Sequence, residues 1–282
     1  MKPILFMTAK KRISSLKKVM INLQKILGKT VNYATSDNFL YEDKTYKCLL
    51  SEVKVKSSIP IVIGAHHSVS TILRMAAWSG FSVRDIYPIA RSVLETLINA
   101  SYIMVEEDGV AEKALRYAAY ADYKYSNREI GSGKLRLKIS STSGDEEPKL
   151  KQFLSEFKGK KSWADLDLPN RIRVIGERGF ESAEQDFLGA YALIYSVSSD
   201  IIHGSPYGFR FFMNHIDKKN LSNSNFLKGV EEQLEWVLIS TTLALCAYIS
   251  VFSKINNMEA AAQLAKDLSL EVLKDKVSRK PK

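Results

Sequence analysis

Four polar or aromatic residues recur at four-residue intervals near the middle of the chain, and the series ends on a histidine. They are Tyr191, Tyr195, Ser199 and His203. Residues four apart lie on one face of an α-helix, so these side chains are expected to form a single polar stripe. Histidine is the commonest general acid–base of enzymes, and the hydroxyls beside it would bind a ligand. The stripe is therefore the first candidate for a functional site.

A second polar stripe is expected about a hundred residues earlier, where Arg91 and Glu95 are again four residues apart. Their neighbours are mostly apolar, so the two charges should pair with each other or with polar groups on another helix. In a catalytic site Arg91 would hold an anion or phosphate, Glu95 would serve as the orienting group, and His203 would act as the general acid–base. Tyr117 and Tyr120, on the next expected helix, would extend the pocket. The alternative is a hydrogen-bonded layer that only sets helix register.

The two stripes resemble the motifs of a bacterial family of unknown function, DUF5677. Its pattern is R-S-x-x-E in one helix and Y-x-x-x-S-x-x-x-H in another, and the resemblance covers roughly residues 60–210. The matching residues here are Arg91, Ser92, Glu95, Tyr195, Ser199 and His203. Members are all-helical, often occur in mobile or defence-related gene neighbourhoods, and are similar in outline to HEPN-type proteins, many of which are dimeric, metal-independent ribonucleases. The resemblance implies that the matching residues line one polar site.

One feature departs from the HEPN ribonucleases, in which four to six residues stand between an arginine and the histidine that follows it. The corresponding positions before His203 are Ser196, Val197 and Ser198. The spacing does occur at Arg210 and His215, but about half a match of this kind is expected by chance. Three functions therefore stay open. One is a toxin or phage-defence effector that cleaves RNA without a metal. The others are a non-catalytic ligand- or RNA-binding sensor and a structural or interaction protein.

No metal or cofactor is expected. His66 and His67 are adjacent, so on a helix they would point about 100° apart. No Asp, Glu or Cys stands three or four residues from either histidine, whereas zinc usually takes three or four protein ligands. The glycine-rich phosphate-binding motifs and the H-E-x-x-H motif are also absent.

Positive charge is concentrated at the two ends of the chain. The net charge is +10: residues 1–29 contribute +8, the last nine residues contribute +4, and the segment between them contributes −2. Apolar residues within 13–27 recur at three- and four-residue spacing, so an amphipathic helix with lysines on its outer face is expected. Such a face is typical of proteins that bind RNA or another polyanion, although a solvated helix face with a frayed tail is the more common explanation. The predicted nucleic-acid contacts are Lys10, Lys11, Arg12, Lys17 and Lys18.

The remaining features favour a cytoplasmic protein. Its two cysteines, Cys48 and Cys246, lie far apart and suit a reducing compartment. The N-terminus has no secretory signal pattern. The longest uncharged run, Trp236 to Phe252, is interpreted as a buried core helix, so no integral membrane insertion is expected. A homodimer is expected by analogy with the HEPN-type proteins.

Helical periodicity recurs along most of the chain. We expect an all-α protein with a single bundle-like domain of eight or nine helices. It would comprise a basic N-terminal helix (1–30), a helical core carrying the polar site (31–256) and a C-terminal helix with a basic tail (257–282). Helices are expected at about 10–27, 60–78, 82–105, 110–129, 149–157, 168–177, 181–202, 225–254 and 257–276, with a tenth candidate at about 36–53. The stretch 131–148 is expected to be a loop, and no β-hairpin is expected.

Overall fold

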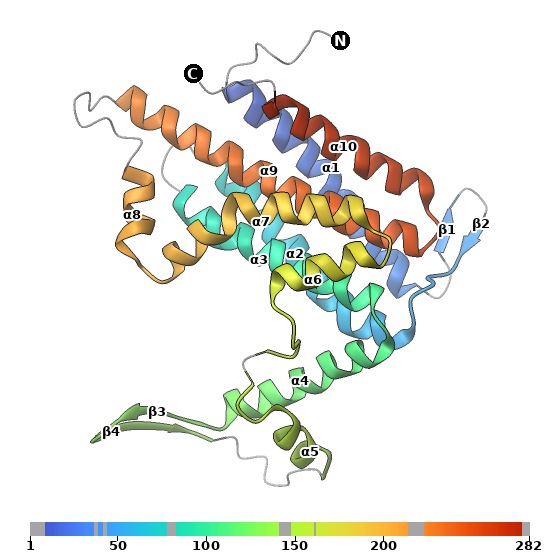
Figure 1. Ribbon diagram of the computed structural model, residues 1–282, viewed down its shortest axis with the longest axis vertical. Coiled ribbons are helices and arrows are strands. Elements are labelled where there is room, and N and C mark those ends of the chain that lie inside the picture. Colours follow the sequence, from blue (N-terminus) through green and yellow to red (C-terminus); the bar gives the residue numbers. More distant parts are fainter. Residues whose placement is uncertain are drawn as a thin grey trace.

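The helix α9 (Asn223–Ile255) is the element on which the others pack (Figure 1). Every residue from 237 to 253 is buried, as expected for a helix that is apolar all round. Among the described residues, one helical stretch, Leu227–Ile255, is long and apolar enough to cross a membrane, and 94% of its apolar window is buried inside the protein. The predicted core helix is thus confirmed, apart from the exposed ring of Trp236.

The computed structural model describes residues 9–36, 39–41, 44–77, 83–140, 148–160, 162–213 and 223–277. Within this part the protein has ten α-helices, and their packing into one domain confirms the all-α prediction. The other helices are α1 (Ala9–Thr35), α2 (Glu52–Met75), α3 (Val83–Val105), α4 (Asp108–Ser126), α5 (Pro148–Phe157), α6 (Leu168–Glu177), α7 (Glu181–Ile202), α8 (Pro206–Met213) and α10 (Glu259–Val277). The strands are β1 (Phe39–Tyr41), β2 (Lys44–Tyr46), β3 (Arg128–Ser132) and β4 (Leu135–Ile139).

Four helices pack directly on α9, namely α1, α3, α7 and α10. The predicted amphipathic character of α1 is confirmed, because Ile13, Leu16, Met20, Leu23 and Leu27 are all buried. α1 and α10 therefore share the core with the segment between them. α3 in turn packs on α2 and α7, and α6 covers the C-terminal part of α3 and the N-terminal part of α7.

Two expectations about local structure are wrong. The helix predicted at 36–53 is replaced by the antiparallel pair β1–β2, in which Phe39 pairs with Tyr46. Aromatic and β-branched residues in this stretch favour strands over helix. The stretch predicted as a loop from residue 131 contains part of a second hairpin, β3–β4, in which Ile130 pairs with Leu137. The rest of that predicted loop, 141–147, lies outside the described residues.

The helices α4 and α5 and the hairpin β3–β4 form an arm, defined here as residues 108–140 and 148–160, that extends away from the bundle (Figure 1). The rings of Tyr117 and Tyr120 pack on Phe157, with ring centroids 5.2 and 5.7 Å from that ring. Phe157 is fully buried although it lies in the arm. This aromatic cluster holds α5 against α4.

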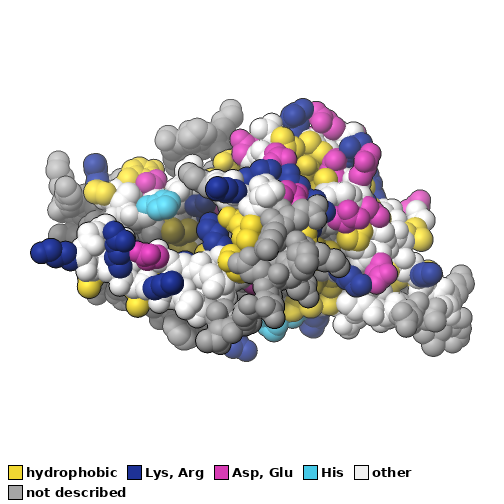
Figure 2. All heavy atoms as spheres, turned by 90° about the horizontal axis from the view of Figure 1, so that it is seen from below, with side chains coloured by type: hydrophobic (Ala, Val, Ile, Leu, Met, Phe, Trp, Pro, Cys, Tyr) yellow, Lys and Arg dark blue, Asp and Glu magenta, His cyan; other side chains and the backbone are white. Residues whose placement is uncertain are grey.

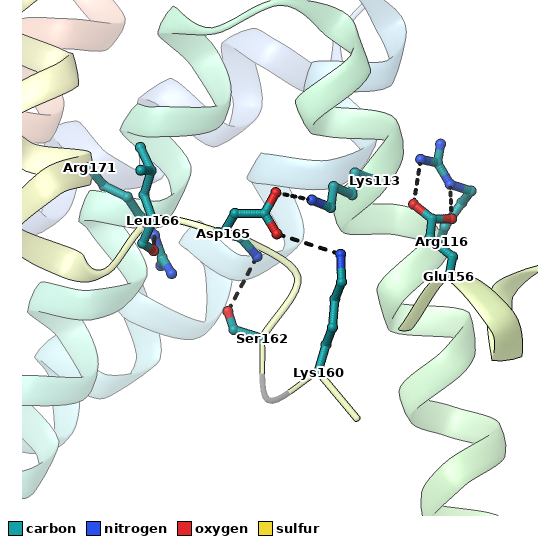
Figure 3. A network of polar contacts seen from close by, with 9 residues as sticks. Lys113, Arg116, Glu156, Lys160, Ser162, Asp165, Leu166 and Arg171 are labelled. Atoms are coloured by element: carbon teal, nitrogen blue, oxygen red, sulfur yellow. Dashed lines mark hydrogen bonds and ion pairs between the residues drawn. The ribbon is translucent and has the colours of Figure 1, made fainter. Parts of the chain in front are cut away.

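Ion pairs connect the arm to the loop that leads back to α6 (Figure 3). Asp165 accepts from Lys113 at 2.5 Å and lies 3.6 Å from the Lys160 ammonium group. Within the arm, Arg116 of α4 forms a bidentate pair with Glu156 of α5, at 2.9 and 3.0 Å. Hydrogen bonds from these cations lower the pKa of both carboxyl groups. The side chains in these pairs are partly exposed to solvent, so each pair adds little to the stability of the protein.

Candidate functional site

The polar stripes of α3 and α7 face each other across an antiparallel helix contact. Ser198 donates a hydrogen bond to the carbonyl oxygen of Tyr87 at 3.0 Å, and Arg91 donates to the hydroxyl of Tyr195 at 3.1 Å. Tyr87 and Arg91 are one turn apart on α3, and their partners on α7 follow in the opposite order. The two helices therefore run antiparallel. This register places the Arg91–Glu95 stripe opposite the N-terminal half of the tyrosine stripe.

Arg91 is the centre of the observed polar site. Its Nε donates to Glu95 at 2.7 Å, and its guanidinium carbon lies 4.1 Å from the centroid of the Tyr195 ring. Tyr195 is stacked on Tyr191, with ring centroids 4.3 Å apart and ring planes 21° apart. The Arg91 and Glu95 side chains are 18% and 35% exposed, so solvent reaches the pair. The structure therefore brings four predicted site residues, Arg91, Glu95, Tyr191 and Tyr195, into one cluster.

A second arginine, Arg171 on α6, extends this cluster. It donates to the carbonyl oxygen of Leu166 at 2.9 Å and to the side-chain oxygen of Asn99, one turn beyond Glu95 on α3. Its guanidinium also lies over the Trp163 ring, 5.4 Å from the centroid. Arg171 is almost fully buried. Sequence reasoning missed it, although an arginine in the apolar face of a short amphipathic helix was a usable signal.

The electrostatics of the cluster follow from this burial. Burial lowers the pKa of Arg171, and nearby negative groups, including Glu95, partly counter that effect. Burial also raises the pKa of the Tyr191 phenol, with smaller contributions from Tyr195 and Asp167. Asp167 caps the N-terminus of α6 by accepting from the Asn170 amide at 3.0 Å. We define the polar cluster as Arg91, Glu95, Asn99, Asp167, Arg171, Tyr191 and Tyr195.

His203 lies at the other end of the helix contact. It is the exposed C-cap residue of α7, and its backbone amide donates to the Ser199 carbonyl at 3.0 Å. Eight residues separate it from Tyr195, which corresponds to about 12 Å along a helix axis. Among the described residues, no hydrogen bond or ion pair joins its imidazole to Arg91 or Glu95. The expected sharing of one cavity by these three groups is not observed.

Other predicted site residues lie elsewhere. Ser199 is partly buried one turn beyond Tyr195. Tyr117 and Tyr120 pack around Phe157 in the arm, where α5 covers them. Their described ring contacts are with Phe157 and with each other, within the arm. The R-x4-H pair ends at His215, which lies outside the described residues.

The basic face of α1 is partly as expected. Lys10, Lys11 and Lys18 are exposed on the outside of the helix. Arg12 instead points inward and forms a bidentate pair with the buried Glu235 of α9, at 3.0 and 3.1 Å. Lys17 is half-buried and lies 3.5 Å from the carbonyl oxygen of Ala76. Three of the five predicted nucleic-acid contacts are thus freely accessible.

The described residues hold no group of three or more His, Cys, Asp or Glu side chains that would bind a metal ion. His66 and His67 have neighbouring rings 5.8 Å apart, at an angle of 88°. Cys246 is fully buried in α9, as predicted, and burial raises the pKa of its thiol. The chemistry available to the cluster is therefore that of guanidinium, carboxylate, amide and phenol groups.

Comparison with known proteins bears on the same helices. No curated protein and no solved structure matches the chain. A family model described as a family of unknown function matches residues 68–220, slightly more than half of the chain. That stretch includes α3, α6 and α7, and with them every member of the polar cluster. The chain therefore belongs to DUF5677, a family of unknown function.

Proposed function

We propose that this chain is a non-catalytic sensor module, in which the polar cluster binds a nucleotide or the end of a single-stranded RNA. The observation that carries the proposal is the position of the Arg91 guanidinium. Glu95 holds it against the Tyr195 ring, and it remains open to solvent. A guanidinium fixed in this way is prepared to bind a phosphate, because its planar fork of donors needs little further ordering.

Two features of the cluster support a phosphate-bearing ligand with a base. Nε and Nη2 of Arg91 are engaged by Glu95 and Tyr195, and no described residue accepts from its Nη1. The N–H groups of Nη1 are therefore available to donate hydrogen bonds to a phosphate oxygen. The stacked pair of Tyr191 and Tyr195 beside it offers aromatic surface, on which nucleic-acid bases commonly stack.

Binding without turnover fits the geometry better than catalysis does. General acid–base catalysis needs a titrating group within hydrogen-bond reach of the reacting atoms, directly or through one water. His203 is about 12 Å from Tyr195 along α7, which is too far for such a contact. Glu95 is already hydrogen-bonded to Arg91.

Fluorescence polarisation with labelled single-stranded RNA, together with thermal shifts against a nucleotide panel, tests the proposal. A ligand that binds the folded state raises the melting temperature by mass action. Arg91→Gln should weaken binding at least tenfold, whereas Arg84→Gln, which removes an exposed arginine of the same helix, should leave it unchanged. Tyr195→Phe removes only the hydroxyl and should weaken binding less. Binding that is equal in the Arg91 and Arg84 variants, or absent from the wild type, contradicts the proposal.

A metal-independent ribonuclease, acting as a toxin or phage-defence effector, is the second candidate. The observation in its favour is His203 itself, an exposed imidazole at the end of the helix that carries Tyr195. The missing arginine partner would then come from elsewhere. HEPN-like ribonucleases are the model for this activity, as the family resemblance suggests.

Incubation of the purified protein with RNA in the presence of a metal chelator tests the second candidate. His203→Ala should abolish cleavage and any growth arrest caused by expressing the chain. His67→Ala, which removes another exposed histidine, should change neither. Equal cleavage by the wild type and the His203 variant would show that a contaminating nuclease is responsible. If RNA neither binds nor is cleaved, the cluster is a structural layer.

A further inference from the structure

Four exposed lysines of α1 lie in a nearly straight line along the outside of the helix. They are Lys11, Lys18, Lys25 and Lys29, and successive members are seven, seven and four residues apart. At 100° per residue these positions fall within about 40° of one another around the helix, and the line is about 27 Å long. We call these four residues the lysine ridge.

The lysine ridge points away from the core of the protein. The buried residues Leu16, Met20 and Leu23 lie on the opposite side of α1, which packs on α9. Tertiary packing also changes which cations a partner can reach. Arg12 and Lys17 are turned towards α9 and α2 respectively, whereas the ridge continues along α1 to Lys29.

The side of the protein formed by α1 carries charge of a single sign. α1 has seven Lys and Arg residues and no acidic residue. The ion pairs described for α1 and α2 use Arg12, Lys54 and Lys56, and in the part of the chain that the structure describes none involves a lysine of the ridge. The face seen from the side of the arm differs, because Asp and Glu side chains lie among its Lys and Arg side chains (Figure 2).

We propose that the lysine ridge binds the phosphate backbone of a nucleic-acid duplex without reading its sequence. A row of single positive charges on a rigid helix is complementary to a partner whose negative charges repeat along a straight axis, and a duplex carries one such charge about every 1.7 Å. Lysines that contact phosphates release bound counterions, and this release drives binding. Ser14 and Asn22, exposed on the same side of α1, can add hydrogen bonds to phosphate oxygens.

The other side chains of α1 favour a duplex over a single strand. Proteins hold single strands by stacking the bases on aromatic rings beside a basic groove. The one aromatic residue of α1, Tyr33, is buried. In a duplex the bases are stacked on one another, so a surface that offers only cations and small polar groups is sufficient to bind the backbone.

The same side chains count against a membrane surface. A helix that lies in a membrane interface inserts an apolar face between the lipids. The apolar face of α1 is instead packed in the core, and Ile21 is its one exposed large apolar side chain.

The lysine ridge shares no residue with the polar cluster, which lies on other helices. Duplex binding by the ridge therefore does not rest on the proposed ligand of the cluster. Arg91→Gln should leave duplex binding unchanged, and loss of the ridge lysines should leave the thermal shift caused by a nucleotide unchanged.

Fluorescence polarisation with the full chain and labelled duplexes of about 20 base pairs, in about 50 to 200 mM salt, tests the proposal. Four phosphate contacts predict a slope of about −3.6 for the logarithm of the binding constant against that of the salt concentration. Lys18→Gln, Lys25→Gln should reduce the slope to about −1.8 and weaken binding about tenfold or more. The control Lys134→Gln, Lys266→Gln removes two exposed lysines from other elements and should bind like the wild type.

RNA and DNA duplexes should bind with similar affinity, because the ridge contacts only phosphates. Circular dichroism should show unchanged helix content in both variants, since glutamine is a good helix former.

Four results would overturn the proposal. The first is a wild-type chain that binds no duplex at the lowest salt concentration. The second is a ridge variant that binds as tightly as the control. The third is a single-stranded oligonucleotide that binds more tightly than the duplex of the same sequence. The fourth is binding to vesicles of phosphatidylserine and phosphatidylcholine, in preference to duplex, that the ridge variant loses, which would assign the ridge to a membrane.

Discussion

Replacement of Asp186 by asparagine should stabilise the protein at alkaline pH. Asp186 lies on α7 and is 6% exposed, and its carboxylate accepts a hydrogen bond from Ser269 on α10. Burial outweighs that hydrogen bond and raises the pKa of Asp186 from 3.8 to about 6. A rise of about two pKa units corresponds to about 3 kcal/mol of cost for holding the ionised form in the folded state.

The sign of the pH dependence follows from proton binding. Between about pH 4 and pH 6 the folded state binds more protons at Asp186 than the unfolded state does, so the free energy of unfolding falls as pH rises. Above pH 6 the full cost is present. The variant Asp186→Asn cannot ionise, and its side-chain oxygen can still accept from Ser269. At about pH 8 it should gain up to about 3 kcal/mol, and at about pH 4 it should match the wild type.

Urea unfolding followed by circular dichroism at both pH values measures this difference. Thermal melts should show a gain of about 5 °C at the higher pH, given the usual relation between stability and melting temperature for a chain of this size. Asp267→Asn on α10 is the matched control, because that aspartate is exposed, and its stability should not depend on pH in this way. An Asp186 variant that is less stable at pH 8, or equally shifted at both pH values, would refute the reasoning.

Three further substitutions should destabilise the protein for different reasons. Arg12→Ala removes a bidentate partner of the buried Glu235 and should cost about 3 kcal/mol in urea unfolding, since truncating one member of a buried ion pair leaves the other in an unfavourable environment. Phe157→Ala should release α5 at a local cost of about 3 kcal/mol, seen as faster proteolysis and hydrogen exchange confined to the arm. Gly208→Ala would place a Cβ 2.9 Å from the backbone of Asp200, so it should lower the melting temperature, whereas Gly109→Ala, where a Cβ meets no atom within 4 Å, should not.

The helices were largely predictable because their signals are local. Apolar residues at three- and four-residue spacing located α1, α3, α7 and α9 to within a few residues, apart from the C-terminal end of α1. Polar residues and glycines at the ends of the apolar patterns marked where many of these helices begin or end. For α7, the sharp stop before Gly204 was expected, and that glycine has a φ of +63° that favours a residue without a side chain. The helix α8, which begins two residues after Gly204, was not predicted.

The strands were missed because their evidence is short and ambiguous. Leu135 to Ile139 alternates apolar and charged residues, which is a strand pattern, but the nearby glycines and serines suggested a loop. The register shows that Gly133 and Lys134 instead form a two-residue turn between paired strands. A pattern only five residues long carries too little information to decide between these structures.

The candidate site was also predictable only in part, namely where its features depend on local helix geometry. Spacing along the chain determined that Arg91 with Glu95, and Tyr191 with Tyr195, would each share a helix face, because helix geometry depends only on nearby residues. Which faces would meet was decided by tertiary packing alone. The antiparallel register of α3 and α7 placed Arg91 against Tyr195, left His203 at the far end, and brought in Arg171 from a third helix. Such contacts join residues about 70 to 100 positions apart, and no local pattern in a sequence encodes them.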